Sequence, residues 1–269
     1  MPIKCNSEKL YKLEYNLIYM HELLIKKTKE KKSLINLDDE IVEGYIKDYF
    51  KKNPKIKVIL ENHSKPGKSK EFKNIIKEIR NNLNRIYGQF QLNKNLTLES
   101  HASTKERINI YPHIYKKIFS ITGEPKTILD ISSGLNSLSY KYLGCKPYYI
   151  ATELAKYDCE ILKGYFKKEN ISGKVLQINL LKENRFPKAD ISFLFKVLDI
   201  LNNKKLAENI IKNLDVKYIV ASFSLITVKG KRMNYPMQGW FQRMLKRLNL
   251  NYTMIKEENE IFYVIKKGL

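Results

Sequence analysis

Five short apolar runs alternate with helical patterns in the second half of the chain, and this alternation constrains the fold more than any other feature. The runs cover residues 127–131, 147–153, 174–179, 189–196 and 216–223. Helical spacing of apolar residues lies between them, notably over 155–168 and 204–214. Because such runs are strand-length and rich in β-branched residues, the alternation predicts a doubly wound, parallel sheet.

The two ends of the chain differ from this central pattern. Residues 251–267 hold two further strand-like runs around a turn at 257–260, which predicts an antiparallel hairpin at the sheet edge. The first hundred residues lack strand alternation and show helical spacing over 10–24, 38–49 and 71–87. We therefore expect an all-helical domain over 1–100 and an α/β domain over 101–269.

The chain is strongly basic, with 50 Lys and Arg, 28 Asp and Glu and a formal net charge of +22. Such an excess opposes compaction and indicates a polyanionic partner, although a general lysine-rich composition is the alternative. The charge is clustered: residues 51–90 hold eleven basic and three acidic side chains, and 216–256 hold eight basic and none acidic. Clustering of this kind favours a nucleic-acid surface.

Cysteine usage and hydropathy indicate the compartment. Three cysteines without CxxC spacing are expected in a reducing cytoplasm, without a disulfide framework or a structural zinc. The sequence shows no signal-peptide-like start and no apolar stretch of membrane-spanning length. We expect a cytoplasmic protein with no metal and no membrane partner.

One constellation suggests a ligand site. Asp130 ends the first predicted strand, Gly134 and Asn136 follow in the turn, and Glu153 ends the second strand. A glycine there allows close approach of a ligand to the backbone, and an acid at the next strand end can accept hydrogen bonds from ribose hydroxyls. The pattern fits an S-adenosylmethionine (SAM) site; ordinary turn residues of another α/β protein are the alternative, and the fingerprint of an NAD site is incomplete.

The segment upstream of this turn resembles a known family. His101-Ala-Ser103-Thr104-Lys-Glu106-Arg107 is similar to the His-x-Ser-Thr-x-Glu-Arg segment of the aminoglycoside-resistance 16S rRNA methyltransferases, which methylate guanine N7 in the decoding-site helix of the small subunit. Residues 193–201 and 220–245 are similar to further family segments, so that the resemblance covers about residues 70 to 267. It implies a class I SAM-methyltransferase fold, Rossmann-like and mostly parallel with a terminal antiparallel hairpin.

The resemblance also implies roles for individual residues. Arg107 would pair with the SAM carboxylate, with a helix-face salt bridge as the alternative, and Glu153 would hold the ribose. Asn179 would bond the adenine, unless it merely forms a turn. Lys196 would contact the target base or its phosphate, and Phe195 or Phe223 would stack on the base, unless these aromatic rings belong to the core. The expected catalytic residues are Lys196 and Phe223, and the expected cofactor contacts are His101, Ser103, Thr104, Arg107, Asp130, Ser132, Gly134, Asn136, Glu153, Leu154, Asn179, Leu180 and Phe195.

The expected partner is 16S rRNA within the 30S subunit, bound by a monomer. The expected RNA contacts are Lys65, Lys68, Lys70, Lys73, Lys77, Arg80, Arg85, Lys229, Lys231, Arg232 and Arg243. The chain departs from the family pattern at Ser132, Ser133, Ser137 and Ser224, the last standing in place of a proline. Methylation of another rRNA or tRNA position, such as adenine N1, and a non-catalytic RNA-binding protein with a vestigial SAM fold therefore remain open.

Overall fold

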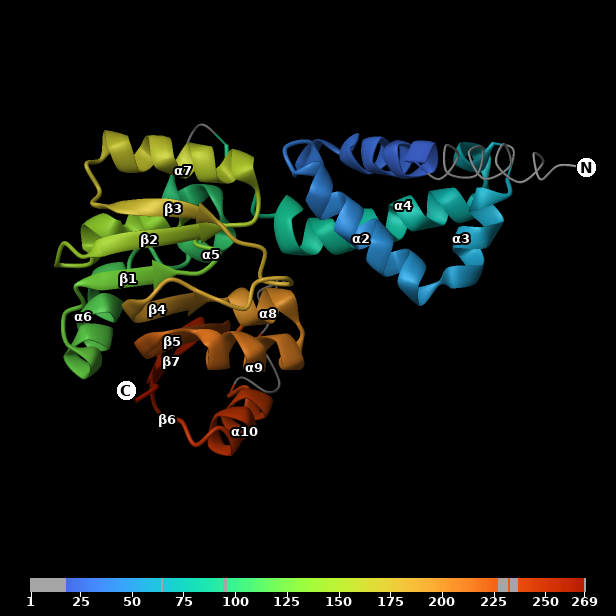
Figure 1. The fold of residues 1–269 in the computed structure, drawn as a ribbon. Coiled ribbons are helices and arrows are strands. Elements are labelled where there is room, and N and C mark those ends of the chain that lie inside the picture. The colour runs from blue at the N-terminus through green and yellow to red at the C-terminus, as the bar shows by residue number, and fades with distance from the viewer. Residues whose placement is uncertain (1–17, 64, 94–95, 227–231, 233–236, 269) are drawn as a thin grey trace, which may run out of the picture. The chain divides into compact units, whose positions relative to one another are not determined.

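The structure is a computed structural model that describes residues 18–63, 65–93, 96–226, 232 and 237–268 (Figure 1). The chain divides into two compact units, Met1–Gln91 and Leu92–Leu269. This division comes earlier than the expected boundary at residue 100. Leu92 belongs to the second unit because its side chain is buried in that unit's core and its N–H donates to Asp158 Oδ1 at 3.2 Å.

The described part of the first unit is entirely helical, as predicted; the predicted helical residues 10–17 lie outside the described range. Its elements are a helix over 18–29, η1 (Lys32–Leu34), α2 (Asp39–Lys52), α3 (Pro54–Glu61), η2 (Pro66–Lys68), α4 (Lys70–Leu83) and the π-helical turn η3 (Asn84–Gly88). Helix α4 begins where Ser69 Oγ accepts the N–H of Phe72 at 3.1 Å, which is a standard N-cap. Its apolar face buries Phe72, Ile75 and Ile79 and leaves the lysines of the other face in solvent.

The second unit is the predicted α/β domain. Its elements are η4 (Leu98–Ser100), α5 (Ala102–Lys105), α6 (Tyr111–Thr122), β1 (Thr127–Asp130), η5 (Gly134–Tyr142), β2 (Tyr148–Glu153), α7 (Lys156–Lys168), β3 (Gly173–Gln177), β4 (Ala189–Phe195), α8 (Val197–Leu201), α9 (Lys204–Asn213), β5 (Val216–Ser224), α10 (Gly239–Arg247), β6 (Asn251–Lys256) and β7 (Glu260–Lys266). The strands form one seven-stranded sheet in the order β3-β2-β1-β4-β5-β7-β6. The first five strands are parallel, and β7 runs antiparallel to both β5 and β6. The predicted sheet and its terminal hairpin are confirmed.

Helices cover both faces of this sheet (Figure 1). One core cluster joins the strands to α6, η5 and α7, and the other joins them to α8, α9 and α10. Adjacent strand residues alternate between the two clusters, so Ile128 packs on the α6 side and Leu129 on the α9 side. Among the described residues, no helix combines the length and the apolar character needed to cross a membrane.

Candidate functional site

The predicted acid–glycine constellation assembles at the carboxyl ends of β1 and β2. The two strands pair in parallel with Asp130 opposite Ala151, which brings Glu153 beside the turn that follows β1. The Glu153 carboxylate accepts a hydrogen bond from the Gly134 N–H. Gly134 has a φ of +49°, and apart from the adjoining backbone no atom lies within 4 Å of the position that a Cβ atom would occupy. The backbone is therefore open to a ligand where doubly wound folds place them.

The carboxyl group of Glu153 has a raised pKa. It is buried, and burial together with the neighbouring Asp158 raises its pKa to about 8, although the N–H groups of Gly134 and Leu154 act in the opposite direction. A carboxyl group in this setting gains from any further hydrogen-bond donor, because donors favour its charged form. The site thus suits a ligand that brings hydroxyl donors.

Asp130 is the centre of a buried hydrogen-bond network. Its Oδ2 accepts from Tyr149 Oη at 2.7 Å and from Asn136 Nδ2 at 3.0 Å, while Asn136 Oδ1 accepts from Tyr111 Oη at 3.0 Å. Burial raises the pKa of Asp130 to about 6, against the lowering effect of Tyr149, Asn136 and Arg107. Asp130 and Asn136 therefore shape the turn from inside, which is compatible with their expected place beside a cofactor.

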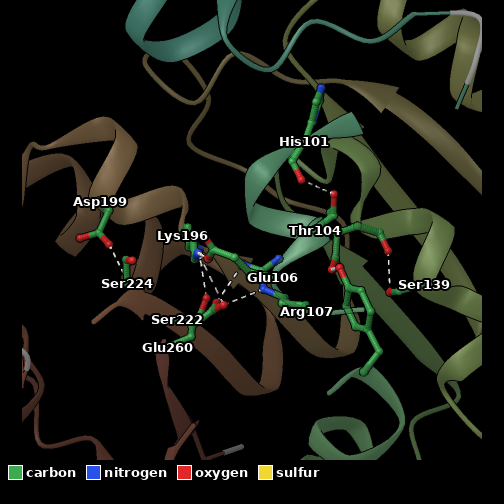
Figure 2. Close-up of polar contacts among 12 residues, drawn as sticks. His101, Thr104, Glu106, Arg107, Ser139, Lys196, Asp199, Ser222, Ser224 and Glu260 are labelled. Atoms are coloured by element: carbon green, nitrogen blue, oxygen red, sulfur yellow. Dashed lines mark hydrogen bonds and ion pairs between the residues drawn. The ribbon is translucent and has the colours of Figure 1, made fainter. Parts of the chain in front are cut away.

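Arg107 forms the most completely buried ion pair of the described residues. Its Nε and Nη2 each donate to a different oxygen of Glu260 at 2.8 Å, and the two side chains are 2% and 3% exposed (Figure 2). Burial alone would lower the pKa of Arg107, but Glu260 and Tyr111 raise it. Arg107 is thus held by Glu260, the first residue of β7, and not by the helix-face salt bridge that was the alternative. Pairing with a cofactor carboxylate stays a prediction.

Lys196 lies directly after β4, at the ligand end of the sheet. Its backbone is left-handed with a φ of +60°, a conformation that non-glycine residues adopt mainly where the surroundings impose it. The Nζ atom lies 2.6 Å from Glu106 and 3.8 Å from Glu260, and the side chain is 12% exposed (Figure 2). Two cations and two carboxylates therefore form one cluster, made from the segment around Arg107, the end of β4 and the start of β7.

The two aromatic candidates for base stacking differ. Phe195 stacks on Phe193 with 4.7 Å between ring centroids, and Cζ of Arg107 lies 5.0 Å from the centroid of the Phe195 ring. Phe223 is completely buried and packs against Phe241 and Tyr263 in the core. Phe223 presents no face to a base in this structure, because the core encloses its ring. We therefore exclude it from the proposed catalytic residues.

Asn179, Leu180 and Leu154, which are expected cofactor contacts, make contacts within the protein. Asn179 Oδ1 accepts from the Leu181 N–H at 3.0 Å, which favours the turn-forming alternative for this side chain. Leu180 is buried in the core cluster on the α9 face. Leu154 is half-buried beyond Glu153, and its carbonyl accepts from Gln177 Nε2 at 3.1 Å. Cofactor contacts from these residues stay predictions.

The segment ahead of Arg107 is held in place by Thr104. Its Oγ1 donates to the Leu98 carbonyl at 2.5 Å and also lies 3.1 Å from the His101 carbonyl. Ser103 is half-buried, and Ser132 has a φ of +49° and donates its N–H to Thr152 Oγ1 at 2.9 Å. The Thr104 contacts support the segment that carries Arg107, and the Ser132 contact ties the turn after β1 to β2. Direct cofactor contacts from these residues stay predictions.

The predicted RNA contacts fall into three groups. Lys65, Lys68, Lys70, Lys73, Lys77, Arg85, Arg232 and Arg243 are exposed. Arg80 is instead used inside the helical unit: its Nε donates to the Thr28 carbonyl at 3.2 Å, its Nη2 donates to the Lys27 carbonyl, and it lies 4.0 Å from Glu30. Lys229 and Lys231 lie outside the described residues.

Sequence patterns do not predict the roles of Glu260, a member of this cluster, and of Asp199, which lies near Lys196. Glu260 was part of a predicted turn, and Asp199 was part of an apolar segment with no assigned role. Asp199 Oδ2 accepts the N–H of Ser224 at 3.1 Å, next to Lys196 (Figure 2). The available signal for Glu260 was an acid at the start of a wholly apolar strand, where burial demands a cationic partner.

Known proteins resemble the chain in sequence and in fold. A 16S rRNA (guanine(1405)-N(7))-methyltransferase of Proteus mirabilis is 26% identical over 181 residues, 63% of this chain and 64% of that protein. Its counterpart in Micromonospora echinospora is 23% identical over 175 residues, 62% of this chain and 63% of that protein. The chain thus spans somewhat less than two thirds of the length of these relatives.

Solved structures give the same fold. The 16S rRNA methylase RmtB superposes with a TM-score of 0.73 at 19% identity, over 92% of this chain and 98% of that one. The 16S rRNA methyltransferase RmtF, solved with S-adenosyl-L-homocysteine, gives a TM-score of 0.71 at 17% identity, over 92% and 98%. The family model described as ribosomal RNA methyltransferase (FmrO) matches residues 74–264. The chain therefore belongs to the FmrO family of ribosomal RNA methyltransferases.

Proposed function

We propose that this protein is a SAM-dependent methyltransferase that acts on 16S rRNA in the 30S subunit, at N7 of a guanine in the decoding-site helix. It would work in the cytoplasm as a monomer. The observation that carries the proposal is the Glu153 carboxylate bonded to the Gly134 N–H at the carboxyl ends of β1 and β2, in a chain of this family. The names of the relatives support the substrate and the ring atom.

The residues present fit SAM. Gly134 faces open space on the side where a side chain would start, so a ligand can lie against the backbone. Glu153 would accept hydrogen bonds from the two ribose hydroxyls, and Arg107 would face the methionine carboxylate. When bound, SAM supplies a methyl group on a positively charged sulfur, which makes that methyl electrophilic.

The protein's contribution to such a reaction is positioning. Guanine N7 carries a lone pair and no proton, so its attack on a methyl group needs no general base. Holding N7 in line with the methyl group can supply the rate enhancement, because a well-oriented reaction avoids most of the entropy cost of encounter. Lys196 would contact the base or its phosphate from the end of β4. The base would be unstacked to enter the pocket.

The test is methyl transfer from labelled SAM to purified 30S subunits, free 16S rRNA and tRNA. Glu153→Ala is the inactive variant, and Glu160→Ala, an exposed acid on α7, is the matched control. We expect label in 30S subunits that maps to a decoding-site guanine and disappears only in Glu153→Ala. Label only in tRNA would contradict the substrate, whereas SAM binding without any label would favour a non-catalytic RNA-binding protein.

A further inference from the structure

The end of β5 has a backbone donor that the sheet does not use. Leu225 donates its N–H to the Asn259 carbonyl at 2.8 Å, on the β7 side of the strand. Successive N–H groups of a strand point to opposite edges, so the Ser224 N–H is directed toward the β4 side. Strand β4 has already ended there, and Asp199 of α8 supplies the acceptor, with Oδ2 at 3.1 Å.

Further contacts connect this bond to the backbone of a basic residue. Ser224 Oγ donates to the Ile226 carbonyl at 2.7 Å, and Ile226 forms an isolated antiparallel bridge with Arg232. Arg232 is exposed and belongs to the basic stretch over residues 216–256 that contains no acid. The contacts from Asp199 through Ser224 and Ile226 thus reach the backbone of Arg232.

The ordinary alternative for Asp199 is an acid in the first turn of a helix, where it interacts favourably with the helix dipole. Helix α8 has only five residues, however, and the Asp199 carboxylate bonds to a different element, 25 residues along the chain. Burial raises the pKa of Asp199 to about 6, while the Ser224 N–H and Lys196 lower it. Burying part of a carboxylate costs free energy, and the hydrogen bond to the end of β5 offsets that cost.

We propose that Asp199 is a positioning residue for rRNA recognition, which holds Ser224 and, through Ile226, sets the place of Arg232 for a phosphate contact. This inference rests on the proposed function, because it assumes that Arg232 faces the RNA. Asp199 itself touches neither SAM nor the target base in this role. The residue at 224 is informative, since the serine supplies an N–H that the proline of the resembling family lacks.

The experiment compares Asp199→Ala, Asp199→Asn and Asp215→Ala, the last removing an exposed carboxylate at the opposite end of β5. We expect Asp199→Ala to raise the KM for 30S subunits about 10-fold, the loss of one hydrogen bond to a charged group. Asp199→Asn keeps an acceptor oxygen and should recover most of the affinity. The SAM dissociation constant and kcat should stay within about two-fold, a margin of about 0.4 kcal/mol.

Two double variants test whether Asp199 acts through Ser224 and Arg232. In Ser224→Pro, which removes the N–H, adding Asp199→Ala should raise KM no further. In Arg232→Ala, adding Asp199→Ala should also have little effect, because the contact that Asp199 positions is already gone. Full additivity in either background, or a loss of SAM binding in Asp199→Ala, would overturn the inference. If the wild type methylates 30S subunits and Asp199→Ala behaves like it, the inference fails alone; if the wild type methylates no RNA, the proposed function fails first.

Discussion

Arg107 and Glu260 are 153 positions apart in the sequence, yet they form a two-bond ion pair with both N–O distances at 2.8 Å. The pair joins the segment after α5 to the first residue of β7. Lys196 Nζ lies 3.8 Å from Glu260 Oε2, the oxygen that accepts from Arg107 Nε. An ion pair this deeply buried contributes little net stability over an apolar pair, but breaking it leaves an uncompensated charge.

Removal of one partner should therefore be costly. We expect Glu260→Leu alone to lower the free energy of unfolding by about 3–5 kcal/mol, because the Arg107 charge stays buried without its carboxylate. Arg107→Met combined with Glu260→Leu should recover most of this loss of stability, whereas SAM affinity should be lost with the Arg107 guanidinium. Urea unfolding and calorimetric SAM titration measure the two effects. A double variant that binds SAM like the wild type would contradict the cofactor role of Arg107.

Glu153 should make the stability of the free protein depend on pH. Its pKa in the folded protein is about 8, against an ordinary value of 4.5, so the folded state binds more protons than the unfolded state between these values. Stability from this group is therefore present at low pH and is lost as pH rises through that window. Glu153→Gln removes the titration and should be more stable than the wild type at pH 8, with a smaller difference at pH 5.

The same variant separates stability from binding. Glu153→Gln should lose SAM affinity at every pH, whereas the affinity of the wild type should increase as pH approaches 8, because the ionised carboxylate is the better acceptor. Thermal unfolding at pH 5, 6.5 and 8 and calorimetry in buffers of different ionisation enthalpy provide the readouts. Equal stabilities of variant and wild type at all three pH values would show that Glu153 does not titrate as described.

The bond between Tyr149 and Asp130 should also be pH-sensitive. Above pH 6 Asp130 is ionised, and Tyr149→Phe removes a charge-assisted hydrogen bond of 2.7 Å. We expect Tyr149→Phe to lower the free energy of unfolding by about 1.5–3 kcal/mol at pH 8 and by less at pH 5, where Asp130 is protonated. Tyr140→Phe is the control, because its hydroxyl donates to the neutral Pro147 carbonyl at 3.0 Å. Equal losses at the two pH values in Tyr149→Phe would contradict this account.

The sheet and the acid–glycine turn were predictable from sequence because they depend on local patterns. Strand-length β-branched runs located β1 to β5, and the acids Asp130 and Glu153 stood at strand ends, where parallel pairing brings them to one edge. Glu260 and Asp199 were not predictable, because their roles depend on which distant element packs beside them. The same limit applies to Phe223, since an aromatic residue near a strand end can face either the core or a ligand, and periodicity alone does not decide.

Arg80 illustrates the same limit for charge patterns. It lies on α4 with Lys73 and Lys77, and the charge pattern alone predicts that all three contact RNA. In the structure its guanidinium bonds the carbonyls at the end of the helix over 18–29, while the two lysines are exposed. Exposed lysines of a basic helix are available to phosphates, whereas Arg80 has its donors committed to protein carbonyls.

We therefore expect substitutions of Lys73 and Lys77 to affect RNA binding and substitution of Arg80 to affect stability. Lys73→Ala with Lys77→Ala should weaken 30S binding and reduce the slope of log K against log salt by about 1.4–1.8, the value for two lost phosphate contacts. The melting temperature should not change, because neither lysine forms part of the core. Arg80→Ala should instead lower the melting temperature and leave the salt slope unchanged. If Arg80→Ala instead reduces the salt slope and leaves the melting temperature unchanged, Arg80 contacts RNA and its bonds to the carbonyls do not stabilise the fold.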